Sequence, residues 1–121
     1  MIANQSVIDY YLNDLGFRKI KFDNASLIEK AADIHHSKIL VGDYRSGIQL
    51  AFISQLGSNI IEYQSPNFFR KFNHFISSTL QLNVISIIGT LKSEDNPKQN
   101  AEYTIRPFNT LAAYDLLHVD E

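Results

Sequence analysis

The chain has 121 residues, of which 45% are hydrophobic and 20% charged, and its formal net charge is −2. This composition is typical of one globular domain, residues 1–121, and it excludes a disordered chain. The near-neutral charge disfavours nucleic acid as a partner, because nucleic-acid binding needs a concentrated basic face. There is no cysteine, which excludes disulfides, thiolate metal sites and cysteine nucleophiles.

The first third of the chain predicts two helices with a short strand between them. Apolar residues at helical spacing predict a helix over residues 6–15. The alternating run "FRKIKF", residues 17–22, predicts a strand. Ser26 and Glu29 match a capping box, so we expect the second helix to begin near Ser26 and to end near residue 36.

After residue 36 the apolar period changes from that of a helix to that of strands. A hairpin turn is expected at residues 45–47, and an exposed turn at residues 94–100 around a proline. We expect strands at residues 38–44, 47–54, 59–65, 83–93 and 101–108, a helix at 65–80, and a last helix from Asn109 or Thr110 through Leu117.

The resulting order of elements is α-(β)-α-β-β-β-α-β-β-α. Most neighbouring strands are joined by connections too short for a crossover helix, so they are expected to pair antiparallel. This order predicts an α+β fold in which a single antiparallel sheet of about five strands packs against the helices.

The helix expected at Ser65–Leu80, "SPNFFRKFNHFISSTL", holds four of the eight phenylalanines. Ser65 and Pro66 suit the N-cap and first helical position. Helical spacing places Asn73 on the opposite, polar side of the helix, together with Arg70, Lys71 and His74. These last three residues could meet an anion or an acidic partner. The apolar arc predicts a core-facing stripe of Phe68, Phe69, Phe72, Phe75, Ile76 and Leu80.

The sequence holds no catalytic motif, and we predict neither an enzyme nor a cofactor. An alternative hypothesis is a small enzyme or metal-binding domain that uses Asp33, His35, His36 and His74. Asp33 and His36 have the i, i+3 spacing of two helical ligands, but adjacent histidines point about 100° apart. Histidines at a helix C-terminus are also explained by the helix dipole, so we do not predict a metal site.

The favoured hypothesis is a non-catalytic domain that binds another protein. Its size and composition are those of small inhibitors and of toxin-neutralising immunity proteins of bacteria and phages, which cover a partner's surface. The partner would be a cognate toxin or enzyme, and the domain a monomer or weak homodimer. The residues expected to bind the partner are Arg70, Lys71, His74, Asp43, Tyr44, Arg45, Glu62 and Glu102.

A dimeric secretion-type chaperone is a second binding hypothesis. The order of a helix, three strands, a long helix, two strands and a last helix suggests it, although the segment 17–37 is extra in that comparison. The start of the chain lacks a basic region before its apolar residues, and no apolar run is long enough to span a bilayer. We therefore expect a cytoplasmic protein with no membrane contact.

Overall fold

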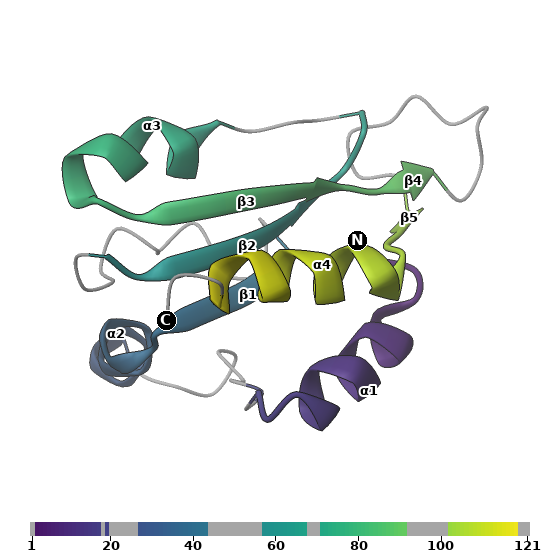
Figure 1. Ribbon diagram of the computed structural model, residues 1–121, viewed down its shortest axis with the longest axis horizontal. Helices are drawn as coiled ribbons and strands as arrows, with labels where there is room; N and C mark the ends of the chain where they lie inside the picture. Colours follow the sequence, from purple (N-terminus) through teal and green to yellow (C-terminus); the bar gives the residue numbers. More distant parts are fainter. Residues whose placement is uncertain are drawn as a thin grey trace.

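A computed structural model of the chain describes residues 2–17, 19, 27–43, 57–67, 71–91 and 102–118, and these form a mixed helix and strand fold (Figure 1). The helices within this part of the chain are α1 (Gln5–Asp14), α2 (Leu27–His36), α3 (Phe72–Leu80) and α4 (Pro107–His118). The strands are β1 (Ile39–Asp43), β2 (Asn59–Gln64), β3 (Asn83–Ile88), β4 (Thr90–Leu91) and β5 (Tyr103–Thr104).

The main sheet is parallel, with the strand order β1-β2-β3 and with Ile61 paired to both Val41 and Ile85. The α+β mixture is confirmed, but the single antiparallel sheet of about five strands is wrong. Helix α3 lies between β2 and β3, and a connection that holds a helix lets consecutive strands run in the same direction. The sequence predicts a helix in that connection, at residues 65–80, and a helical connection favours a parallel crossover.

Strands β4 and β5 form a separate antiparallel ladder, in which Leu91 pairs with Tyr103. The predicted strand 83–93 is therefore divided at Gly89 between two sheets. A Cβ atom on Gly89 would overlap the ring of Tyr103 and lie 2.9 Å from the carbonyl oxygen of Thr104. Only glycine lets the chain pass this close to β5.

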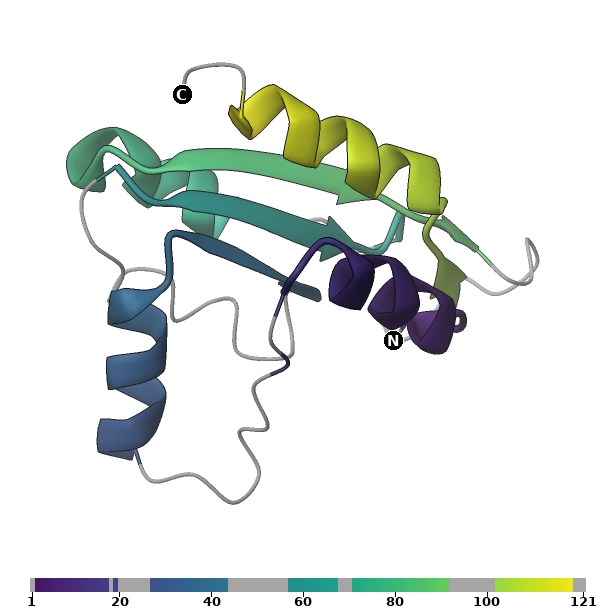
Figure 2. The same cartoon turned by 60° about the horizontal axis from the view of Figure 1, so that its bottom comes forward.

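The two faces of the parallel sheet are covered by different helices (Figure 2). Alternation along β2 directs Ile61 and Tyr63 to one face, and Ile60 and Glu62 to the other. Burial on both faces explains the continuous apolar runs of these strands. The first face forms the larger core with α1 and α4, through Ile2, Ile8, Ile61, Tyr63, Ile87, Tyr103, Ile105 and Ala113. Next to α3, the second core joins Ile60 and Leu82 to Leu40, Leu80 and Val84.

Asn4 connects the N-terminal segment to the chain just after β5 through two hydrogen bonds. Its Nδ2 donates to the carbonyl oxygen of Ile105 at 2.8 Å, and its Oδ1 accepts from the N–H of Ile105 at 3.0 Å. The Asn4 side chain bonds to Ile105 and makes no capping hydrogen bond to α1. Helix α1 begins at Gln5, one residue before the predicted start at Ser6.

Two further helices begin elsewhere than predicted. Helix α4 begins at Pro107, before Asn109 or Thr110, since proline suits a first helical position. Helix α3 begins at Phe72 rather than just after Ser65, whose Oγ accepts the N–H of Asn67 at 3.2 Å. The predicted strand 47–54 and the turns at 45–47 and 94–100 lie outside the described residues, and of 17–22 only residues 17 and 19 are described.

Tyr63 makes the stability of the fold sensitive to alkaline pH. Its hydroxyl shares a hydrogen bond of 2.8 Å with Thr110 Oγ1 in α4, and burial raises its pKa from 10.0 to about 12. A raised pKa adds stability that is complete below pH 10 and is lost as the pH rises through 12. We expect Tyr63 to account for a loss of about 2–3 kcal/mol between pH 10 and 12.

Urea denaturation across this pH range measures the effect. The variant Tyr63→Phe cannot ionise at this position, so its free energy of unfolding should fall by about 2–3 kcal/mol less than that of the wild type. If the free energies of unfolding of the two proteins fall equally with pH, folding does not raise the pKa of Tyr63.

Candidate functional site

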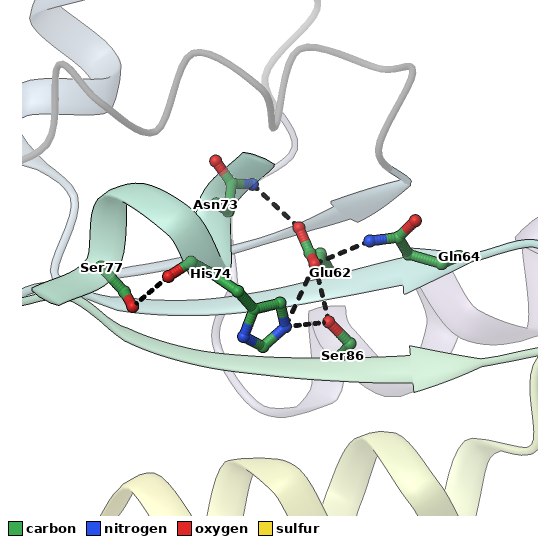
Figure 3. A network of polar contacts seen from close by, with 6 residues as sticks. All are labelled: Glu62, Gln64, Asn73, His74, Ser77 and Ser86. Carbon is green, nitrogen blue, oxygen red and sulfur yellow. Dashed lines mark hydrogen bonds and ion pairs between the residues drawn. The ribbon is translucent and has the colours of Figure 1, made fainter. Parts of the chain in front are cut away.

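Glu62 occupies the middle of β2 and points toward α3, with none of its surface exposed (Figure 3). A buried carboxylate is costly unless hydrogen-bond donors replace water around it. Three neutral donors do so, one from β2 itself, one from α3 and one from β3. Gln64 Nε2 donates to Oε1 at 2.8 Å, Asn73 Nδ2 to Oε2 at 2.8 Å, and Ser86 Oγ to Oε1 at 2.6 Å.

His74 lies where this network meets solvent. Its Nε2 is 2.5 Å from Ser86 Oγ and 3.5 Å from Glu62 Oε1, and 39% of its side chain is exposed. Ser86 has a single hydroxyl proton, which it gives to the carboxylate, so Nε2 must carry the proton in its own contact with Ser86. We call Glu62, Gln64, Asn73, His74 and Ser86 the Glu62 cluster.

The Glu62 cluster contains a serine, a histidine and an acid, yet its geometry differs from that of a catalytic triad. In a triad the histidine accepts the serine proton on one ring nitrogen, while the acid holds the other nitrogen. Here Ser86 and Glu62 both approach Nε2 of His74, and the serine proton points to the carboxylate. The hydrogen bonds of Glu62 tie α3 to β2 and β3, and a buried polar network of this kind favours one packing of the helix on the sheet.

The outer face of α3 consists of Lys71, His74, Phe75 and Ser78, all of which are exposed. Phe75 is 81% exposed, so its assignment to the core is wrong. Asn73 is fully buried although the sequence placed it on the polar side. The buried acid needs a donor from the covering helix, so α3 turns Asn73 inward. Phe75, about 200° further around the helix, then faces outward.

The other predicted binding residues are dispersed. Glu62, which was expected to bind a partner, is interior, and its oxygens accept hydrogen bonds from within the fold. Asp43, at the end of β1, accepts the hydroxyl of Tyr103 at 2.9 Å. Glu102 is exposed just before β5. Arg70, Tyr44 and Arg45 lie outside the described residues.

The residues of the metal alternative are not assembled. Asp33, His35 and His36 belong to α2, whereas His74 belongs to α3, and the two helices lie well apart in both views (Figures 1 and 2). Within the described ranges, no group of three His, Asp or Glu side chains is placed to hold a metal ion. None of the helices described there is long and apolar enough to cross a membrane.

No protein-family model, curated protein or solved structure matches this chain. The element order that suggested a secretion-type chaperone is not found in the described residues, where two helices precede the first strand and the main sheet is parallel.

Sequence reasoning missed Gln64, Asn73 and Ser86 as partners of Glu62. A signal for them was present, because Glu62 interrupts the otherwise apolar run "IIEY", residues 60–63, of a strand buried on both faces. An acid at such a position must find donors on its own strand, on the next strand and on the covering helix. Their identities depend on the strand register and on the rotation of α3.

Proposed function

We propose that this protein is a non-catalytic binding domain that covers a partner protein's surface with the outer face of α3. It would act as a small inhibitor or toxin-neutralising immunity protein. The observation that carries the proposal is Phe75, a large aromatic side chain that is 81% exposed on a helix whose inner side is held by the Glu62 cluster.

The residues around Phe75 suit a binding site for an acidic surface. Lys71 lies one helical turn before it, as the hydrogen bond from the Phe75 N–H to the Lys71 carbonyl at 2.8 Å shows. An aromatic side chain that can be buried beside a charged rim is typical of binding hot spots. The first turn of α3 holds no acid, and Lys71 opposes the helix dipole there. A lysine at this position is better explained by an acidic partner than by helix stability.

The Glu62 cluster supports binding by fixing the rotation of α3. The hydrogen bond from Asn73 to Glu62 keeps Phe75 directed outward before any partner arrives. A side chain already held in its bound direction loses less conformational entropy on association.

Affinity capture with the immobilised protein, followed by calorimetry with the purified partner, tests the proposal. We expect Phe75→Ser to weaken binding by about 30-fold or more, since truncated hot spots typically cost 2 kcal/mol or more. Lys71→Ser should weaken binding less and flatten its salt dependence. Both variants should keep the free energy of unfolding within about 0.5 kcal/mol, because they change exposed side chains.

Tyr10→Ser is the matched control, because Tyr10 is an exposed aromatic on a different helix, α1. It should leave the affinity unchanged. A partner that binds wild type and Phe75→Ser equally, but loses Tyr10→Ser, would place the binding surface on α1 and contradict the proposal.

A further inference from the structure

Helix α4 is apolar on two sides, although only one side packs on the sheet. Asp115 is its single acid or base apart from the terminal His118. Its inner side places Thr110 and Ala113 against the core, as Figure 2 shows for the helix as a whole. Its opposite side leaves Phe108 76% exposed and Leu116 65% exposed. A helix that is apolar all round is normally buried all round.

We infer that a second copy of this chain packs on the outer face of α4, made of Phe108, Ala112, Asp115 and Leu116, in an antiparallel arrangement with two-fold symmetry. The inference is independent of the proposed function, which concerns α3. A two-fold interface must present the same surface to itself, and this face meets that condition. Phe108 lies four residues before Ala112, and Leu116 lies four residues after it.

With the two-fold axis at Ala112, each Phe108 lies level with Leu116 of the second copy. The two Ala112 residues then meet at the centre, where their small side chains allow the helices to approach closely. At 1.5 Å per residue, Phe108 and Leu116 lie about 6 Å on either side of the axis. The contact between Phe108 of one copy and Leu116 of the other is therefore formed twice, once on each side of the two Ala112 residues.

The exposed charges at the two ends of this face also favour the antiparallel direction. Arg106 lies just before α4 and Asp115 lies toward its end, and both are exposed. In antiparallel packing, Arg106 of one copy and Asp115 of the other are offset by only about 4.5 Å along the helix axis. An arginine side chain is long enough to span this offset. Parallel packing would place like charges together.

One helix face is smaller than the roughly 800 Å² per partner that stable complexes bury, so we expect a weak dimer. Light scattering and sedimentation over a concentration series should show the mass rising from 13.8 kDa toward twice that value, with a dissociation constant between about 10 and 500 μM. Phe108→Ser and Leu116→Ser should each weaken the dimer about 100-fold, because each substitution acts twice. Phe75→Ser on α3 is the control and should dimerise as the wild type does.

Two further variants test the direction of packing. Arg106→Glu and Asp115→Arg should each weaken the dimer by about 3–10-fold, and the double variant should recover it. Because the chain has no cysteine, Ala112→Cys should form a disulfide dimer under mild oxidation much faster than Phe75→Cys. A wild type that stays at 13.8 kDa up to about 500 μM, equal cross-linking of the two cysteine variants, or no recovery in the double variant would overturn the inference.

Discussion

Replacing Glu62 with alanine is expected to lower the free energy of unfolding by about 3–5 kcal/mol. The carboxylate accepts hydrogen bonds from Gln64, Asn73 and Ser86 in the interior. Without it, these donors would remain in a space that excludes water, and each unsatisfied buried group costs about 1–3 kcal/mol. The loss falls below the sum of three such costs, because Ser86 is only partly buried and can turn its hydroxyl proton to water.

Urea denaturation of a small series measures this effect. Glu62→Gln keeps one oxygen acceptor but sets an NH2 group against the donors, so we expect a loss of about 1–3 kcal/mol. Asp14→Ala removes an exposed acid from α1 and should change stability by less than about 0.5 kcal/mol. A loss under about 1 kcal/mol for Glu62→Ala would mean that α3 does not need the Glu62 cluster to stay on the sheet.

Tyr103→Ala is the second substitution with a large expected effect, a loss of about 3–5 kcal/mol. The Tyr103 side chain is almost fully buried in the larger core, and its hydroxyl donates to Asp43 Oδ2 at 2.9 Å. Removing it would leave a cavity where β5, the end of β1 and Gly89 meet. Tyr103→Phe keeps the ring and should cost only about 1 kcal/mol.

The contact between Tyr103 and Gly89 allows a second check of the same site. Gly89→Ala should destabilise the wild type by about 1–3 kcal/mol, because the new Cβ meets the Tyr103 ring. In the Tyr103→Ala background the same substitution should cost clearly less, and the difference is the coupling energy of the two positions. Additive losses would show that the ring does not fill the space beside Gly89.

The helices were predictable because their signals are local. Apolar spacing in residues 6–15 and the run from 26 to 36 depend only on near neighbours, and α1 and α2 follow them closely. The direction of the strands depends on connections. Short connections favour antiparallel pairing, but the helix between residues 65 and 80 makes the connection of β2 to β3 long enough for parallel pairing.

The site was less predictable, because the rotation of α3 depends on a residue far away in the sequence. Helical spacing alone grouped Phe75 with the core and Asn73 with the surface. The buried Glu62 on β2 reverses both assignments by requiring the Asn73 amide. The charge pattern predicts that Lys71 and His74 lie on the polar side of the helix, and both lie on the outer face of α3, beside Phe75.

The central claim is that α3 keeps its inner side for the fold and its outer face for a partner. The most direct measurement is an NMR titration of the isotope-labelled protein with the captured partner. We predict that the largest chemical-shift changes fall at Lys71, His74, Phe75 and Ser78, the outer face of α3. Changes confined to α1 or to the outer face of α4, with α3 unaffected, would contradict the claim.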